Sequence, residues 1–130
     1  MKPNAHTEVR IEFVAEQLRA RVTGVFDSTT AKTELARGIA KAMRLGIRKV
    51  LVDARALQGE ISILERFALG EDVAALTRGR IAIAIVDLPE RVWPDRFVET
   101  VAANRGALIK VTTDYTEALA WLDAENRVDC

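Results

Sequence analysis

The stretch Lys49–Gly70, KVLVDARALQGEISILERFALG, decides the fold of this chain, because an apolar strand, a charged loop and a helix follow one another in it. The apolar run Val50–Val52 is typical of a strand and ends at Asp53. The sequence from there to Glu60 predicts a loop, and a helix is expected over about residues 62–77. We expect this strand to lie in the middle of a sheet, with any functional site on the loop and the helix after it.

Two strands and a helix are predicted before this stretch. Apolar and polar residues alternate over residues 8–13 and again over residues 18–26, which is the pattern of half-buried strands. Only a few residues separate the two runs, so they predict an antiparallel hairpin. A helix is expected from Asp27 or Ser28, either of which can cap it, as far as Gly46.

Two further strand and helix pairs are predicted after the stretch. Residues 80–86, RIAIAIV, form the most strand-like segment of the chain and are typical of a central strand that is covered on both faces. Trp93 and Pro94 are expected to open the next helix, which ends at Gly106. A strand follows over residues 107–112, and Asp114 with Glu117 is expected to cap the last helix.

The predicted fold class is α/β, with the order β-β-α-β-α-β-α-β-α and a mostly parallel five-stranded sheet that has an antiparallel N-terminal strand. Several polar side chains of the predicted strands share one face of this sheet: Glu8, Arg10, Glu12, Arg19, Arg21, Lys110 and Thr112. We therefore expect that face to be partly solvated and the helices to lie mainly on the other face. A single domain over residues 1–130 is predicted, with flexible ends at 1–7 and 124–130.

Composition restricts the partners and the location of the protein. Lys plus Arg and Asp plus Glu both number 19, so the net charge is zero and no bulk field favours nucleic acid. No apolar run has the length of a membrane span, and the only cysteine, Cys130, can form no internal disulfide. We predict a cytoplasmic protein that binds no nucleic acid.

Most catalytic templates are missing from the sequence. It contains no G-x-x-x-x-G-K loop, no G-x-G-x-x-G and no Cys or His spacing suited to zinc. The only histidine, His6, lies near the start of the chain, which disfavours a Ser-His-Asp triad. We predict that the chain is not an enzyme and uses no cofactor.

Three carboxylates form the one metal hypothesis. Asp53, Asp87 and Asp114 each lie at or just after the carboxyl end of a predicted parallel strand, where ligand crevices form. If they converge they could hold Mg²⁺, and Arg55 and Arg91 could hold an anion beside it. A metal-dependent enzyme that uses these carboxylates is the third and most distant function hypothesis. The alternative is that aspartate is common at strand ends and helix caps, and that the three side chains point apart.

A family resemblance rests on four segments together with the order of the elements. These segments are VLVDARALQG from Val50, ERFALG from Glu65, RFVETVAANRGA from Arg96 and EALAWL from Glu117. The chain resembles the STAS-like family typified by anti-sigma-factor antagonists, and especially its small bacterial SpoIIAA-like members of unclear function. The resemblance implies a non-catalytic regulatory or protein-interaction module. Sec14-like lipid-binding domains share the architecture, which implies the alternative of a carrier for a small apolar or lipid-like ligand.

The resemblance also implies a phosphorylation site. In the antagonists a partner kinase phosphorylates a serine at the start of the helix after the third strand, and the matching position here is Ser62. The chain departs from that motif, because Ile61 stands where an aspartate is usual and no glycine follows. The alternative interpretation is that Ser62 only caps the helix.

The loop and the helix of the opening stretch supply the other candidate residues. Those of the loop, for a ligand or partner, are Asp53, Arg55, Gln58 and Glu60. The helix carries two apolar stripes, one with Ile63, Phe67, Gly70 and Ala74 and one with Leu69, Val73 and Leu76. One stripe suffices to pack on a sheet, so the other could contact a neighbouring helix, line an apolar pocket or form a homodimer seam. The arginines Arg66, Arg96 and Arg105 are interpreted as solvated helix charges.

Overall fold

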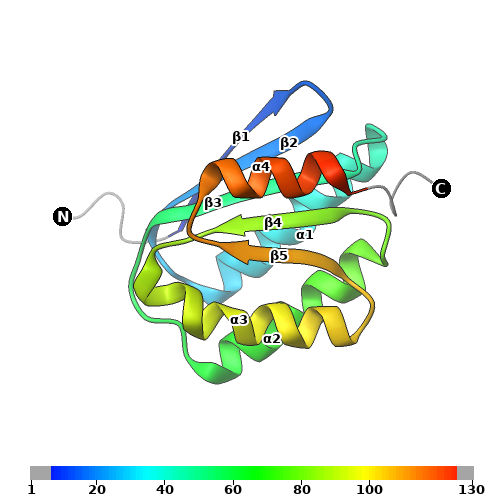
Figure 1. Cartoon of the computed structure of the whole chain (residues 1–130). Coiled ribbons are helices and arrows are strands. Elements are labelled where there is room, and N and C mark those ends of the chain that lie inside the picture. Colours follow the sequence, from blue (N-terminus) through cyan, green and yellow to red (C-terminus); the bar gives the residue numbers. More distant parts are fainter. Residues whose placement is uncertain (1–6, 126–130) are drawn as a thin grey trace.

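The computed structural model describes residues 7–125 and contains nine helices and strands in that part of the chain (Figure 1). Their bounds are β1 Glu8–Val14, β2 Gln17–Val25, α1 Ser28–Arg44, β3 Lys49–Gln58, α2 Ile63–Thr77, β4 Ala82–Val86, α3 Pro89–Asn104, β5 Leu108–Thr112 and α4 Tyr115–Ala124. The five strands form one sheet in the order β1-β2-β3-β4-β5, in which β1 is antiparallel to β2 and the other pairs are parallel. The predicted fold class is confirmed.

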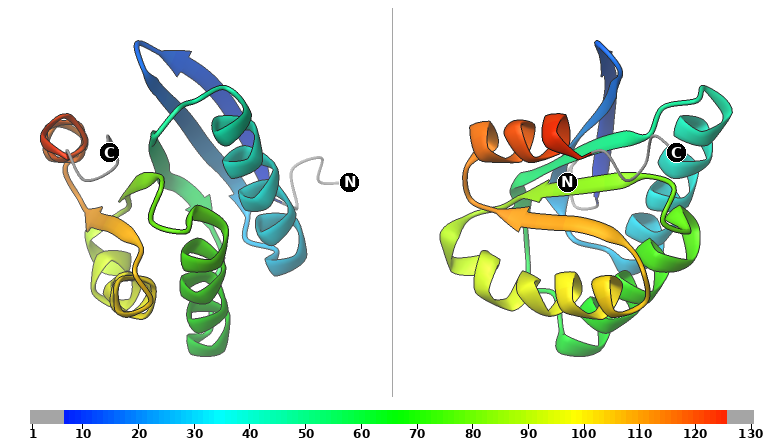
Figure 2. Two further views of the ribbon diagram at one scale, coloured as in Figure 1. Left: turned by 90° about the vertical axis from the view of Figure 1, so that its right-hand side faces the viewer. Right: turned by 45° about the vertical axis from the view of Figure 1, so that its right-hand side comes forward.

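The helices are distributed unequally over the two faces of the sheet, as predicted. Figure 2 shows α1, α2 and α3 on one face and α4 alone on the other. The outward charges of the hairpin share the face of α4, and Arg10 pairs with Arg21 across β1 and β2. Because α4 lies over β3, β4 and β5, the hairpin part of this face stays open, and both arginines are exposed.

Each face of the sheet has its own core. The larger core lies under the three helices and contains Leu18, Ile39, Ala42, Val50, Val73, Ala74, Ile81, Ile83, Ala102 and Ala107. The smaller core lies under α4 and contains Leu51, Ala82, Ala84, Val86, Ala118 and Leu122. Alternate residues of β3 and β4 enter the two cores because successive side chains of a strand point to opposite faces.

Two predicted boundaries are wrong. The loop expected from Asp53 is strand as far as Gln58, because β3 continues to pair with β2 after a register shift between Arg21 and Thr23. The third helix begins at Pro89 and not at Trp93, with Pro94 inside it. Pro89 occupies the first turn, where a missing amide costs no hydrogen bond.

Side chains cap three of the helices. Asp27 accepts a hydrogen bond from Thr30 N over 3.0 Å at the start of α1. Asp114 accepts from Thr116 N and Glu117 N at the start of α4, whereas the Glu117 carboxylate accepts from the Thr112 hydroxyl instead of completing a capping pair. In residues 7–125 no helix combines the length and the apolar character that crossing a membrane requires.

Parts of the chain that were expected to be flexible fall mostly outside the described residues. So do His6 and Cys130. Thr7, however, is buried, and its hydroxyl donates to Val25 O over 2.9 Å and accepts from Asp27 N over 2.9 Å. Thr7 is therefore held against the end of β2 and the start of α1.

Candidate functional site

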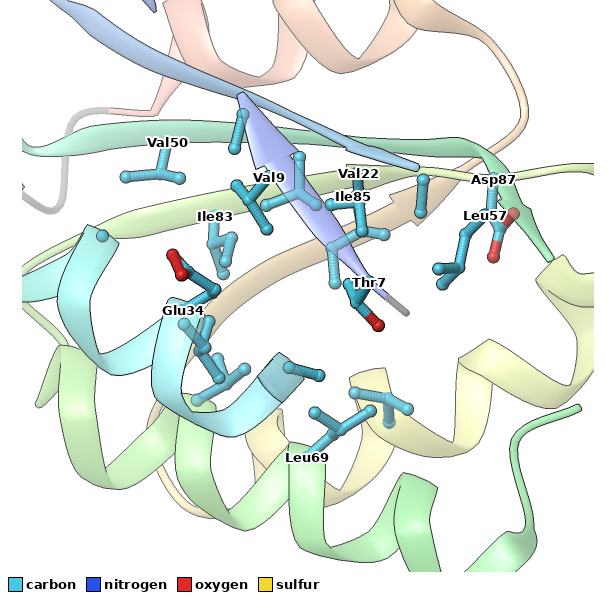
Figure 3. A pocket seen from close by; sticks show the side chains of 18 of the residues that line it. Thr7, Val9, Val22, Glu34, Val50, Leu57, Leu69, Ile83, Ile85 and Asp87 are labelled. Carbon is cyan, nitrogen blue, oxygen red and sulfur yellow. The ribbon is translucent and has the colours of Figure 1, made fainter. Parts of the chain in front are cut away.

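A cavity of about 170 Å³ lies between the sheet and the three helices α1, α2 and α3. Side chains from β1 to β4 form one wall, including Val9, Val22 and Ile85, and Figure 3 shows Leu69 of α2 on the opposite side. Nearly all of the lining atoms are apolar. The cavity therefore occupies part of the space where a closed hydrophobic core would be expected.

Small side chains and partial exposure explain how the cavity persists. Gly38 and Ala31 of α1 and Ala20 of β2 line it, and no atom lies within 4 Å of where a Gly38 Cβ would be. Val52 and Ile85 belong to the central strands β3 and β4, yet both are only half-buried. Protein interiors are normally packed at the density of organic crystals, so two half-buried central positions mark an unfilled site.

One end of the cavity is polar because of Asp87, the residue after β4. This side chain is only 2% exposed. Its Oδ1 atom accepts from Leu88 N over 2.8 Å and from Arg91 Nε over 2.9 Å. Arg91 also donates from Nη2 to Ala54 O over 3.0 Å, so it joins α3 to β3 behind the carboxylate.

Asp95 of α3 lines the same end and is 7% exposed. Arg66 of α2 donates from Nε to Asp95 Oδ1 over 3.2 Å and from Nη1 to Ile61 O. Burial raises the pKa of Asp95 to about 7, helped by a hydrogen bond with Asp87 and by the charge of that carboxylate, while Arg66 opposes the rise. Near neutral pH Asp95 is therefore protonated for part of the time.

The interpretation of Arg66 as a solvated charge is wrong, and Asp95 was not among the predicted site residues. A signal for both exists in the helix periodicity. Arg66 lies one turn before Gly70 on the buried face of α2, and Asp95 lies between Val92 and Val98 on the buried face of α3. Two opposite charges on facing apolar stripes favour a buried ion pair, because neither charge is stable there alone.

The three carboxylates of the metal hypothesis do not meet. Asp53 binds Arg55 through both oxygens, over 2.9 and 2.8 Å, on the face of α4. Asp87 lines the cavity under the opposite face, and Asp114 caps α4. Within residues 7–125 no group of three or more His, Cys, Asp or Glu side chains is arranged to hold a metal ion. The three side chains of the metal hypothesis are therefore not brought together in the described part of the chain.

The candidate loop residues belong mainly to β3 and do not form one site. Arg55 lies 5.4 Å from the centre of the Tyr115 ring at the start of α4. Its hydrogen bond holds the pKa of Asp53 below the usual value. Gln58 and Glu60 are exposed at the far end of the strand and beyond it. The contact of Arg55 with Tyr115 therefore joins β3 to α4 on the face opposite the cavity.

Ser62 forms both halves of a capping box at the start of α2. Its hydroxyl accepts from Glu65 N over 3.1 Å, and its own amide donates to Glu65 Oε1 over 2.8 Å. The side chain is exposed to solvent. Ser62 thus has a capping role in the fold and is also accessible to another protein.

The two apolar stripes of α2 have different surroundings. Leu69 and Val73 line the cavity, and Leu76 packs on the edge of the larger core. The other stripe approaches α3 closely, because a Cβ on Gly70 would lie 2.8 Å from Val101 side-chain atoms. The tight contact explains why glycine stands there.

The ends of α2 and α3 nearest Ser62 carry exposed apolar side chains. Ile63 is 61% exposed and Trp93 is 81% exposed. Phe67 and Phe97 are partly exposed, and their ring centres lie 6.4 Å apart. We call Ile63, Phe67, Trp93 and Phe97 the α2–α3 surface.

Comparisons with known proteins agree on the fold. No family model matches the sequence, and no curated protein is detectably related to it. An anti-sigma factor antagonist from Mycobacterium paratuberculosis superposes with a TM-score of 0.60 at 15% identity, over 94% of this chain and 97% of that one. An uncharacterised protein from Shewanella loihica superposes with a TM-score of 0.54 at 20% identity, over 94% and 98% of the two chains. That protein has a SpoIIAA-like fold, and this chain has the same fold, as the sequence resemblance implied.

Proposed function

We propose that the protein binds a small apolar molecule in the cavity under α1, α2 and α3, and that it does so without catalysing a reaction. The observation that carries this proposal is the cavity of about 170 Å³ with its apolar lining. Dry apolar cavities of roughly 150 Å³ in other proteins bind benzene. The space therefore suits a compact molecule of about one ring.

The half-buried central strands give a physical reason for binding. Val52 and Ile85 keep apolar surface exposed in the centre of the fold. A ligand that covers this surface contributes about 25 cal/mol for each Å² of apolar area removed from water. Binding an apolar molecule thus completes a core that the chain leaves unfinished.

Toluene tests this proposal as a neutral, ring-sized probe. Isothermal titration calorimetry should give saturable binding to the unaltered protein. Leu69→Trp places a larger side chain in the cavity and should abolish binding, whereas Leu64→Trp changes a residue of the same helix that is 77% exposed and should not. Equal binding by both variants, or no saturation with the unaltered protein, would show that the cavity is not a ligand site.

A second candidate function is a protein-interaction or regulatory module that uses the α2–α3 surface. Exposed apolar side chains on neighbouring helices favour a protein contact. One of the structural relatives is an anti-sigma factor antagonist, which supports a regulatory role without identifying a partner. We take a second copy of the chain as the first partner to test.

Sedimentation velocity over a range of concentrations tests self-association through this surface. Phe97→Ser should shift a dimer to monomer, while Leu45→Ser, at an exposed position after α1, should leave the distribution unchanged. A protein that stays monomeric at high concentration has no homodimer seam.

Phosphorylation of Ser62 is the regulatory form of the same proposal. The hydroxyl is exposed at a helix N-terminus, where the backbone amides favour an anion. Incubation with bacterial extract and ATP, followed by mass spectrometry, should detect phosphate on Ser62 and none in a Ser62→Ala control. Absence of phosphate from the unaltered protein would leave Ser62 as a cap alone.

A further inference from the structure

The cavity lining contains acidic side chains and no basic ones among the described residues. Among the described residues that line it, the ionisable side chains are all acidic: Glu34, Asp87 and Asp95. Arg66 and Arg91 bind the two aspartates, but neither arginine belongs to the lining. Figure 3 shows Glu34 and Asp87 in separate parts of the cavity, with apolar side chains between them. A ligand in this space therefore meets carboxyl groups as its only ionisable neighbours among residues 7–125.

Two of these carboxyl groups, Asp87 and Asp95, line the polar end of the cavity. Burial, a hydrogen bond with Asp87 and the charge of that carboxylate raise the pKa of Asp95 to about 7. The charged groups around Asp95 are Arg66 from α2, Asp87 from the end of β4 and Arg91 from its own helix, and Glu34 of α1 lines the same cavity. Asp87 and Asp95 thus offer a ligand cation two buried carboxyl groups at one end of the cavity.

We propose that the natural ligand is a ring-sized apolar molecule with one primary ammonium group, which Asp87 and Asp95 hold at the polar end of the cavity. This inference rests on the proposed function and adds the chemical class of the ligand. The ammonium keeps its three protons and donates hydrogen bonds to the carboxylates. The O–H bond of the Asp95 carboxyl group breaks, and its proton passes to the solvent.

A cation fits the lining better than an anion or a purely apolar molecule. Among the residues that line the cavity, a ligand carboxylate would meet acidic side chains and no cationic one, and like charges in a poorly solvated site repel strongly. An apolar molecule gains binding free energy from burial alone and leaves the Asp95 proton in place. A ring that carries an ammonium group gains binding free energy both from burial of the ring and from charge-assisted hydrogen bonds to the aspartates.

Three probes of similar size test the proposal by calorimetry: toluene, benzylamine and benzoate. Benzylamine should bind more tightly than toluene, and benzoate should not bind measurably. Because the Asp95 proton must leave, benzylamine affinity should rise about tenfold between about pH 6 and about pH 8, while toluene affinity stays constant. Titrations near pH 6 in two buffers of different ionisation enthalpy should show release of about one proton per benzylamine bound.

A matched pair of variants locates the ammonium. Asp95→Asn resembles the protonated side chain and can still donate to Asp87, so it should bind toluene as before but lose the tighter binding of benzylamine and its pH dependence. Glu71→Gln removes an exposed carboxylate of α2 that lies outside the cavity lining and should leave the pH profile of benzylamine unchanged. Toluene binding reports whether each variant retains the cavity.

The outcomes separate this inference from the function on which it rests. If neither toluene nor benzylamine binds the unaltered protein, the cavity is not a ligand site and the proposed function fails. If toluene binds but benzylamine binds no more tightly, or shows no pH dependence or proton release, the ammonium site is wrong and the apolar site stands. Benzoate binding as tight as that of benzylamine would also overturn the charge argument.

Discussion

Arg66 Nε lies 3.2 Å from Asp95 Oδ1, and this ion pair joins α2 to α3 at the polar end of the cavity. Both side chains are close to nine-tenths buried. A little further along the same two helices, Gly70 lies against Val101. One polar contact, Arg66–Asp95, and one close apolar contact, Gly70–Val101, therefore join α2 to α3 beside the cavity. Each contact can be removed by a single substitution.

Replacing Arg66 should destabilise the protein. Arg66→Leu leaves Asp95 buried without its cationic partner, and we expect the free energy of unfolding to fall by about 2 kcal/mol. The loss is smaller than for a fixed charge, because Asp95 can take up a proton. Arg96→Leu is the matched control, since Arg96 pairs with Glu99 at the surface and its loss should cost less than about 0.5 kcal/mol. Urea unfolding of both variants measures the difference, and equal losses would contradict a buried pair.

The raised pKa of Asp95 should make stability depend on pH. The folded protein holds this proton up to about pH 7, whereas the unfolded chain releases it near 3.8. Between these values the folded state binds more protons, so the contribution of Asp95 is full at low pH and is lost as the pH rises through about 7. Relative to Asp95→Asn, the unaltered protein should lose about 2–3 kcal/mol between about pH 5 and about pH 8 in urea unfolding. A constant difference between the two proteins would show that Asp95 has no raised pKa.

Two helical glycines should respond oppositely to the same substitution. Gly70→Ala puts a Cβ within 2.8 Å of Val101, and overpacking of this kind costs about 1–3 kcal/mol. Gly38→Ala meets no atom within 4 Å in the middle of α1, so it should stabilise the protein by about 0.5–1 kcal/mol. Thermal unfolding compares the two variants. Val101→Ala should restore part of the stability lost in Gly70→Ala. If it restores none, the loss of stability does not come from contact with Val101.

Loss of the capping box should be measurable at Ser62. Ser62→Ala leaves the amide of Glu65 without its acceptor and should lower the free energy of unfolding by about 1 kcal/mol. Ser62→Asp should retain most of the stability, because aspartate is also a good N-cap. Ser28→Ala is the control at the first residue of α1, where Asp27 provides the cap, and its effect should be within about 0.5 kcal/mol. If Ser62→Ala proves neutral, the hydroxyl does not stabilise the helix.

Local patterns in the sequence determined the elements, their order and the face of the sheet that stays open. Period-two alternation identified β1 and β2, and the charges at Arg10 and Arg21 predicted the exposed face correctly. Such signals are readable because each depends on neighbours a few residues away. The end of β3 was missed, because its last residues are held by pairing with β2 and not by an apolar run of their own.

The tertiary structure alone decided the site. The cavity exists because small residues of β2 and α1 face half-buried central strands, and no local pattern reveals how well such surfaces fill the space between them. Asp87, Arg66 and Asp95 stand in different elements, and only the packing of α2 and α3 on β4 brings them together. Lys49–Gly70 thus specified the centre of the fold by itself. The ligand-binding properties that we propose depend on distances between residues far apart in the chain.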